Sequence, residues 1–507
     1  MFVIGADIGT TSTKALVFDL YGRILGSHSI EYPLYTPNPG WAEQDPDEIF
    51  SAVLHSVKGA VAKAGIDPRQ VTGIGFSSAM HSLIPLGPQG EPLSRAIIWA
   101  DNRSADQAER IKREMGGLEI YRRTGTPVHP MAPLAKLLWL KENQPALHSG
   151  ARYWVGLKEY VLFKLSGSMV IDIGLASATG LFNLKALAWD QEALALAGVR
   201  KEQLPDPVDT LHVLRGIESG YAEAMGLPDT VPLVVGGGDG MLSNLGTGAI
   251  APGVVAATIG TSGAIRQVTD KPVTDPSART FCYALTKEHW VVGGAISNGG
   301  IVLRWFRDNF AEAEQAVARR LGKDPYDLIT EYAAKVAPGS DGLLFLPFLS
   351  GERAPYWNAN ARGVLFGLAL HHTKQHIARA TLESAIYAMH SVHLALAEQA
   401  GRAVEIRATG GFARSPFWLQ IMADVFGREV VVAESHESSC LGAAVLTMVA
   451  LGLAPSLDVV HQMVKTRERR TPDMAAHATY SELFNLYSQV YENTVKQMEA
   501  IAAYQRR

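Results

Sequence analysis

The sequence contains few cysteines, no excess of basic residues and no apolar run long enough to span a bilayer. Cys282 and Cys440 are the only cysteines and stand far apart, which excludes a disulfide framework and a cysteine-based zinc site. The formal net charge of −4 lacks the basic character that nucleic-acid binding requires. The longest apolar stretch, residues 441–454, is shorter than the roughly 20 residues of a membrane-spanning helix and predicts a buried helix instead. We therefore expect neither nucleic acid nor a membrane as a partner.

The length of 507 residues exceeds what one hydrophobic core supports, because single cores stop growing at roughly 250 to 300 residues. Two large domains are therefore predicted. Apolar residues make up 47% and charged residues 19%, as in an ordinary globular protein. The first residues turn acidic at Asp7 and lack the basic flank of a signal peptide. Together with the low cysteine content, this start indicates a cytoplasmic protein.

Two segments of the chain share the pattern of an apolar strand, a Gly-Thr turn and a returning strand. The first, FVIGADIGTTSTKALVFDLYGRILGSHSIEY, continues into a third strand and predicts an antiparallel meander. The second, VVAATIGTSGAIRQV, begins near residue 255. Residues 7–12 align with residues 258–263 on a shared Ile-Gly-Thr core, at a separation close to half the chain. A duplicated domain explains this repeat, with the boundary at residues 246–253, and strands followed by helical patterns elsewhere predict α/β layers.

Both Gly-Thr turns are candidates for phosphate binding. Small residues leave backbone N–H groups and hydroxyls available to surround an anion, and the first turn adds a lysine. The residues concerned are Thr10, Thr11, Ser12, Lys14, Gly260 and Thr261. A plain hairpin with Ser/Thr turn chemistry is the alternative for each turn. Asp7, at the end of the strand before the first turn, favours phosphate binding because a carboxylate there can hold Mg²⁺ directly or through water.

A further candidate lies in the Gly-rich segment 236–240, where Asp239 follows an apolar strand and projects from its end. Such a carboxylate either accepts a hydroxyl proton or is a turn aspartate bonded to local amides. The two Gly-Thr turns favour the first interpretation, because a kinase needs one base and little other covalent chemistry. The sequence has no Walker A loop and no G-x-G-x-x-G unit between a strand and a helix, which argues against P-loop and Rossmann folds.

Three segments combine polar donors with apolar or aromatic neighbours, as a polyhydroxylated ligand requires: SSAMHS, WADNR and TGTPVHP. The candidate acceptor-binding residues in them are Met80, His81, Trp99, Arg103 and His129. Each has a structural alternative, since a histidine such as His81 can be a satisfied core residue and an arginine such as Arg103 can form a surface ion pair.

The segments MAPLAKLLWLKEN (131–143) and GVLFGLALHHTKQHIARATLE (363–383) resemble the two signatures of the FGGY carbohydrate kinases, and the resemblance covers nearly the whole chain. It implies two actin-like (ribonuclease H-like) α/β domains with a duplicated core, and a cleft between them where ATP and the sugar meet. We accordingly expect an N-terminal domain at 1–247 that binds the sugar and carries the base, and a C-terminal nucleotide-binding domain at 248–455. A helical extension packed on the core is expected at 456–507. A homodimer is implied by the resemblance alone.

The resemblance also assigns roles by position. Asp7 would serve Mg²⁺, Asp239 would be the catalytic base, and the two Gly-Thr turns would contact the phosphates of ATP. Further nucleotide contacts are implied for Gly300, Arg304, Gly410, Gly411 and Ser415. Arg304 and Ser415 stand where glycerol kinases have amides, so the adenine side departs from the pattern of that branch.

The acceptor is expected to be a sugar acid. Met80-His81 resembles the Met-His pair of xylulose kinases, whereas glycerol kinases have Arg-Glu there. Longer strings such as RTGTPVHPMAPLAK, DGMLSNLG and FLSGERAPYWN are most similar to the gluconate-phosphorylating branch. Gluconate carries a carboxylate, for which Arg103, Lys158, His81 and His129 are candidate partners.

The expected reaction is transfer of the γ-phosphoryl group of ATP to the terminal hydroxyl of gluconate, giving 6-phosphogluconate, with Mg²⁺ as cofactor. Phosphorylation of xylulose or of another ketose or polyol is the alternative within the family. An actin-like ATPase acting as a sensor or chaperone is the alternative from another class, because this fold also serves such roles.

Overall fold

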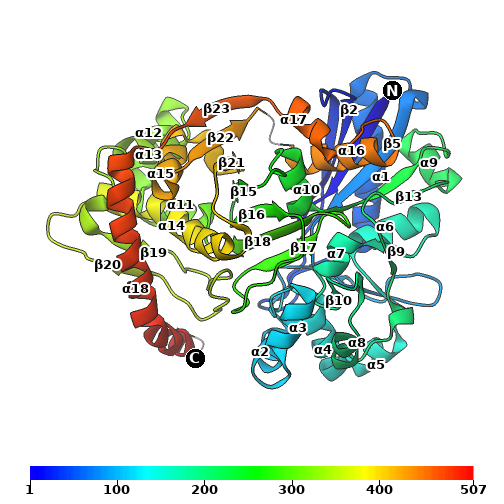
Figure 1. Cartoon of the computed structure of the whole chain (residues 1–507), viewed down its shortest axis with the longest axis horizontal. Helices are drawn as coiled ribbons and strands as arrows, with labels where there is room; N and C mark the ends of the chain where they lie inside the picture. Colours follow the sequence, from blue (N-terminus) through cyan, green and yellow to red (C-terminus); the bar gives the residue numbers. More distant parts are fainter. Residues whose placement is uncertain (435–436, 506–507) are drawn as a thin grey trace. The chain divides into compact units, whose positions relative to one another are not determined.

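Two large sheets carry most of the strands of the computed structural model, which describes residues 1–434 and 437–505 (Figure 1). Residues 435, 436, 506 and 507, which fall within the two C-terminal segments expected from the sequence, lie outside the described residues. The first sheet has the order β13-β14-β5-β1-β2-β3. Its strands are β13 (Val213–Leu214), β14 (Leu233–Gly238), β5 (Val71–Ser78), β1 (Phe2–Ile8), β2 (Ser12–Asp19) and β3 (Ile24–Glu31).

The central strands of the first sheet are covered on both faces. In β1, Ile4 and Ala6 belong to the hydrophobic cluster that includes α1 (Pro46–Ala64), whereas Val3 belongs to the cluster that includes α16 (Ser438–Ala450). This division follows from the alternation of side chains along a strand. The apolar run that predicted a buried helix forms α16, so that expectation is confirmed.

The second sheet repeats the central part of the first. Its order is β17-β18-β16-β15-β21-β22-β23. Its strands are β17 (Phe281–Ala284), β18 (Trp290–Ile296), β16 (Gly263–Thr269), β15 (Val254–Ile259), β21 (Glu405–Thr409), β22 (Glu429–Ala433) and β23 (Thr466–Arg470). In both sheets the first strand of the repeat pairs antiparallel with the next strand in sequence and parallel with a distant one.

The strand registers of the two halves are similar, although the second turn is one residue shorter than the first. Asp7 lies opposite Lys14 on β2 and Ser77 on β5. Thr258 lies opposite Ala264 on β16 and Thr409 on β21. Because the residues that precede the two Gly-Thr turns occupy the same register, the duplicated α/β core predicted from the sequence is confirmed.

The chain separates into two compact units. The first contains Met1–Ala251, Val268–Val292 and Glu437–Lys465, and the second contains Pro252–Gln267 with the described parts of 293–436 and 466–507. The chain therefore returns twice to the first unit after residue 251, where the sequence predicted one division. The physical reason for the second return is α16, whose apolar side chains cover one face of the first sheet.

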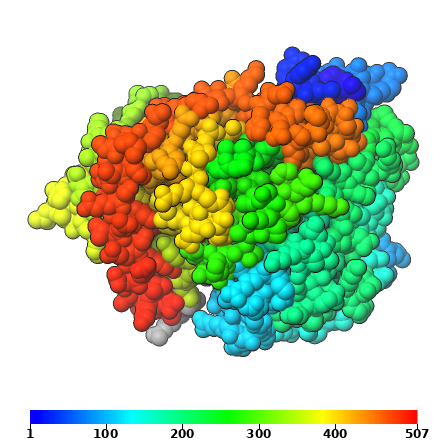
Figure 2. All heavy atoms as spheres, in the orientation of Figure 1, coloured from blue at the N-terminus to red at the C-terminus, as the bar shows by residue number. Residues whose placement is uncertain are grey.

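The expected helical extension at 456–507 contains a strand as well as helices. Residues Thr466–Arg470 form β23, which pairs antiparallel with β22. Its sequence, TRERR, has no apolar residue and so gave no strand signal. The helix α18 (Met474–Gln505) follows and lies on the surface of the second unit (Figure 2). Two of its own side chains, Tyr480 and Tyr487, are buried. In residues 1–434 and 437–505, no helix has both the length and the apolar character of a membrane span.

Candidate active site

Three carboxyl ends of neighbouring strands meet in the first unit. Strands β1, β5 and β14 are parallel, and Ser77 at the end of β5 lies opposite both Asp7 on β1 and Gly237 on β14. Asp239 follows β14 directly and is the first residue of α10 (Asp239–Gly246). Ligands of α/β sheets bind at such strand ends, so the structure places both predicted carboxylates at one edge.

Asp7 is half-buried and lies in a field of negative charge. Burial and the neighbouring Asp239 raise the pKa of Asp7 to about 7, with a smaller contribution from Glu437. A hydrogen bond of 2.6 Å donated by the Ser77 hydroxyl opposes this rise, as does the charge of Lys14. A cation bound at this carboxylate would relieve the excess negative charge.

Asp239 is also half-buried, and its Oδ1 accepts a 2.6 Å hydrogen bond from the backbone N–H of Gly240. Its position in the first turn of a helix stabilises the ionised carboxylate through the helix dipole. A Cβ placed on Gly238 would lie 2.9 Å from Cγ of Met80, so the expected acceptor residue Met80 lies beside the strand end that carries Asp239. The expected base, Asp239, and one expected acceptor contact, Met80, therefore lie at the same end of β14.

The first Gly-Thr turn is held by bonds from three sides. The Trp99 indole N–H donates 2.9 Å to Thr10 Oγ1, and the Gln44 amide donates 2.6 Å to the Thr10 carbonyl. The Tyr32 hydroxyl donates 2.5 Å to the carbonyl of Gly9, which itself donates its N–H to Ser12 O at 3.0 Å. The turn is thus fixed before any ligand arrives.

The remaining members of this turn differ in their surroundings. Thr11 is exposed and Ser12 is half-buried. Lys14 Nζ donates to both carboxylate oxygens of Glu437, at 3.0 and 3.1 Å. Because Lys14 remains partly exposed, a phosphate could compete with Glu437 for its ammonium group.

The neutral imidazole rings of His81 and His129 carry their protons on different nitrogen atoms. The Nδ1 atom of His81 lies 2.7 Å from the Ala178 carbonyl, which can only accept, so this nitrogen carries the proton in the neutral ring. The Nδ1 atom of His129 instead accepts from the backbone N–H of Met131 at 3.1 Å. In the neutral rings, His81 therefore offers an acceptor at Nε2 and His129 offers a donor there.

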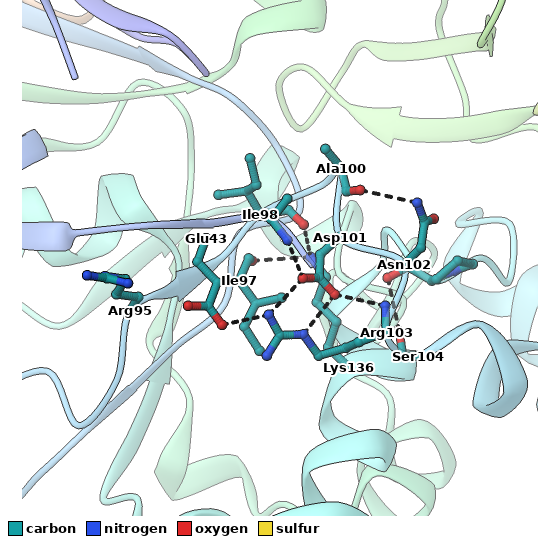
Figure 3. Close-up of polar contacts among 12 residues, drawn as sticks. Glu43, Arg95, Ile97, Ile98, Ala100, Asp101, Asn102, Arg103, Ser104 and Lys136 are labelled. Atoms are coloured by element: carbon teal, nitrogen blue, oxygen red, sulfur yellow. Dashed lines mark hydrogen bonds and ion pairs between the residues drawn. The ribbon is translucent and has the colours of Figure 1, made fainter. Parts of the chain in front are cut away.

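Arg103, predicted as a carboxylate partner for the ligand, is committed to protein carboxylates instead. Its guanidinium donates to Asp101 at 2.7 and 2.9 Å and to Glu43 at 2.7 Å (Figure 3). It also stacks 3.6 Å above the ring of Trp41, and its side chain is only 3% exposed. Arg103 therefore forms an ion pair, as in the alternative considered from the sequence, but the pair is buried and does not lie at the surface as that alternative supposed.

Lys158 is likewise enclosed. It is fully buried, forms an ion pair with the buried Asp172 and donates 2.9 Å to the carbonyl of Val235. From this position its ammonium supports β14 and does not reach a ligand unless it leaves Asp172. Of the four cationic candidates for the ligand carboxylate, the structure leaves His81 and His129 half-buried and partly accessible.

The second unit contains the other Gly-Thr turn. Gly260 N–H donates 2.9 Å to the carbonyl of Ser262, two residues on, whereas Gly9 N–H in the first turn reaches Ser12, three residues on. The first residues of α11 (Gly300–Phe310) attach to this turn, because Gly300 N–H donates 2.7 Å to Gly260 O and Ile301 N–H donates 3.1 Å to Thr261 O. The structure thus brings together two segments, 260–262 and 300–301, that are far apart in sequence.

A cavity of 290 Å³ opens beside this turn. Six of the residues predicted to contact the nucleotide line it: Gly260, Thr261, Gly300, Arg304, Gly411 and Ser415. Aromatic rings of Tyr326 and Phe412 add flat apolar surface of the kind that receives a nucleobase. The arrangement supports one nucleotide-sized site built within the second unit.

Three of the residues predicted to contact the nucleotide have structural roles that the sequence did not reveal. A Cβ on Gly410 would lie 2.5 Å from the Ile259 carbonyl, and one on Gly300 would lie 2.5 Å from the Gly260 carbonyl. Both glycines therefore permit close packing of backbone. The Ser415 hydroxyl accepts from the N–H of Trp418 at 3.3 Å and caps α15 (Pro416–Phe426).

Sequence reasoning missed several residues that shape the site. Ser77 lies in the SSAMHS segment that was considered for acceptor binding, but its bond to Asp7 was not expected, and Glu437 gave no signal. Lys136 is the one charged residue within the apolar run PLAKLLWL that begins α4 (Pro133–Asn143). In the part of the chain that the structure describes, no group of three or more His, Cys, Asp or Glu residues is poised to hold a metal.

Comparison with known proteins agrees with this architecture. Residues 2–246 match the N-terminal domain and residues 255–451 the C-terminal domain of the FGGY family of carbohydrate kinases. The chain is 49% identical to a gluconokinase of Bacillus subtilis over 506 residues, covering 100% of this chain and 98% of the relative. It is 30% identical to a xylulose kinase of Staphylococcus epidermidis, with 98% of each covered.

Among solved structures, a gluconate kinase from Lactobacillus acidophilus superimposes with a TM-score of 0.92. The two share 39% sequence identity, and the alignment covers 97% of this chain and 98% of the other. With both domains matched and the duplicated α/β core in place, the chain belongs to the FGGY family of carbohydrate kinases and is a phosphotransferase.

Proposed function

We propose that this kinase phosphorylates D-gluconate with ATP, giving 6-phospho-D-gluconate and ADP. The observation that carries the proposal is the 49% identity to a gluconokinase across the full length of both chains. It is supported by the site in the first unit, where an accessible carboxylate lies beside residues suited to a polyhydroxylated acid.

The acceptor lies against Met80, His81, Trp99 and His129 in this proposal. Met80 offers an apolar contact for C–H groups, and His81 Nε2 accepts from a hydroxyl in its neutral form. In its neutral form His129 donates from Nε2, which suits a carboxylate oxygen of the ligand. Arg103 and Lys158 act behind this surface, because both are already paired with buried carboxylates.

ATP occupies the cavity of the second unit in this proposal, with its phosphates at Gly260 and Thr261. Support comes from the exposed backbone at Gly260 and Gly411, where a Cβ would meet no atom within 4 Å. Asp7 would hold Mg²⁺, since carboxylate oxygens are preferred ligands of this ion and the local field is negative. When bound, Mg²⁺ neutralises charge on the transferred phosphoryl group.

Asp239 is the base in this mechanism. It accepts the proton of the terminal hydroxyl as that oxygen forms a bond to the γ-phosphorus of ATP. The bond from the γ-phosphorus to the bridging oxygen breaks, and ADP leaves. The half-buried carboxylate at a strand end has the accessibility that this transfer requires.

An ADP-release assay at fixed Mg·ATP tests the proposal, with gluconate, xylulose, ribulose, glycerol and no acceptor run in parallel. We expect kcat/KM for gluconate to exceed that for every neutral acceptor. A higher value for xylulose would overturn the choice of substrate in favour of the relatives that share Met80-His81. ADP release that is equal with and without any acceptor would contradict a sugar kinase and favour an ATPase.

A further inference from the structure

Lys136 has no part in the chemistry described above, yet it is buried beside the acceptor residues. It lies on α4 and is fully inaccessible to solvent. Its ammonium group donates three hydrogen bonds, to the carbonyls of His81 at 2.6 Å, Ile98 at 2.9 Å and Ile97 at 3.2 Å. Figure 3 shows Lys136 near Ile97 and Ile98. An ammonium group has three N–H bonds, so each of them has one backbone partner.

The first of these bonds fixes the residue that carries the expected acceptor contact. His81 has a φ of 69°, in the left-handed region that few residues other than glycine adopt. Such a conformation persists when surrounding contacts hold it, and it is found at functional sites. Lys136 holds the carbonyl of His81 while Ala178 holds its ring, so both backbone and imidazole have a defined place.

The other two bonds fix the segment that supports the first phosphate turn. Ile97 ends β7 (Ala96–Ile97), which pairs with β4 (Glu43–Gln44). Trp99 follows this segment directly and donates to Thr10, and Gln44 on the paired strand donates to the same residue. The two carbonyls that Lys136 binds therefore lie one and two residues before the side chain that anchors Thr10.

Burying the charged ammonium group of a lysine at this position costs free energy. Burial lowers the pKa of Lys136 to about 7; the charge of Asp101 opposes this shift and that of Arg103 adds to it. Asp101 itself is bonded to Arg103 and to the N–H of Ala42. The ammonium group is therefore paired with carbonyl dipoles, and apolar residues often replace buried charges without loss of stability. The three bonds to carbonyls instead fix the positions of the two backbone segments that the ammonium group joins.

We propose that Lys136 is a positioning residue, whose buried ammonium group sets the backbone of His81 and of Ile97–Ile98 and so places the acceptor contact and the phosphate turn together. The proposal rests on the acceptor site proposed above and goes beyond it by naming what orients it. Lys136 does not touch the substrate in this account.

The test replaces Lys136 by Met, which keeps the length and apolar stem, and by Gln, which keeps an N–H donor group. Steady-state kinetics with gluconate and ATP are measured for both, with ADP affinity from calorimetry. We expect Lys136→Met to raise the KM for gluconate and lower kcat, with a combined loss in kcat/KM of about ten- to a hundredfold. Lys136→Gln should recover part of that loss, and the affinity for ADP should stay within about twofold for both, because the cavity in the second unit is built from other residues.

The matched control is Leu138→Ala on the same helix, a buried core truncation that makes no bond to His81 or Ile97. It should lower the melting temperature while leaving the KM for gluconate unchanged. A folded Lys136→Met or Lys136→Gln enzyme whose KM and kcat match the wild type would overturn the proposal. If the Lys136→Met variant does not fold, the kinetics of Lys136→Gln decide between the two outcomes. If the wild-type enzyme prefers another acceptor, the proposed substrate fails and the same comparison is made with that acceptor.

Discussion

Ser77 donates a 2.6 Å hydrogen bond to Asp7 across the parallel strands β5 and β1. The equivalent pair in the second sheet, Thr409 and Thr258, has a 2.7 Å hydrogen bond between its two hydroxyls. The two halves thus keep the same contact before each Gly-Thr turn, but only the first half contains a carboxylate there. Because it has this carboxylate, the first half is the one proposed to hold Mg²⁺.

The first prediction concerns this carboxylate. Ser77→Ala removes the bond that orients and stabilises the ionised Asp7, and hydrogen bonds to charged groups contribute about 1.5–3 kcal/mol. We expect the Mg²⁺ concentration for half-maximal activity to rise about tenfold or more. The control is Thr409→Val, which removes the corresponding hydroxyl in the second half and should leave the Mg²⁺ requirement unchanged. Equal Mg²⁺ curves for Ser77→Ala and wild type would contradict the role given to Asp7.

The second prediction separates packing from nucleotide binding in the second unit. A Cβ on Gly300 would lie 2.5 Å from a backbone oxygen, whereas one on Gly411 would meet no atom within 4 Å. Gly300→Ala should therefore lower the melting temperature and weaken ATP binding together. Gly411→Ala should keep the melting temperature and raise the KM for ATP several-fold. Wild-type ATP kinetics in Gly411→Ala would contradict the proposal that the nucleotide binds in this cavity.

The third prediction concerns Arg103. Lysine cannot reproduce the two-pronged bond to Asp101 or the stacking on Trp41, so Arg103→Lys should lower the free energy of unfolding by about 2–4 kcal/mol. Arg110→Lys is the control, because the Arg110–Glu142 pair is exposed and should contribute less than about 1 kcal/mol. The ratio of kcat/KM for gluconate to that for xylulose should stay constant in Arg103→Lys. A selective loss for gluconate would restore Arg103 as a direct carboxylate partner.

The fourth prediction concerns the pH dependence of stability. Burial raises the pKa of Glu159 to about 7, with Lys158 opposing and Asp172 assisting. Because the folded state favours the protonated form, this contribution is complete below the ordinary pKa of a glutamate and is lost as pH rises through 7. Between pH 5 and 8 the free energy of unfolding of the wild type should therefore fall relative to that of Glu159→Gln, by up to about 3 kcal/mol. Denaturation curves that give a difference independent of pH would contradict this account.

The repeated core could be predicted from sequence because its signal is local. The Gly-Thr turns interrupt two apolar strands at the same place, and the alignment of Asp7 with Thr258 follows from counting residues. Strand β23 could not be predicted, since an edge strand of polar residues has no alternation of apolar side chains.

The partners of buried charges were beyond the same reasoning. Arg103 and Glu43 are 60 positions apart, and the three carbonyls bound by Lys136 belong to two segments 38 to 55 positions away. Only the tertiary fold decides whether such a cation meets a protein oxygen or a ligand. For this reason Arg103 and Lys158 looked like ligand partners in sequence, while Lys136 did not attract notice.

The proposed reaction is tested by identifying the molecule that receives the phosphoryl group of ATP. Wild-type protein and Asp239→Asn are incubated with Mg·ATP and gluconate, and the products are identified by ³¹P NMR. The account predicts 6-phosphogluconate and ADP in equal amounts with the wild type, and a rate at least about 100-fold lower with Asp239→Asn at similar ATP affinity. No phosphorylated gluconate with the wild type would contradict the proposed substrate, and near-normal turnover in Asp239→Asn would contradict the proposed base.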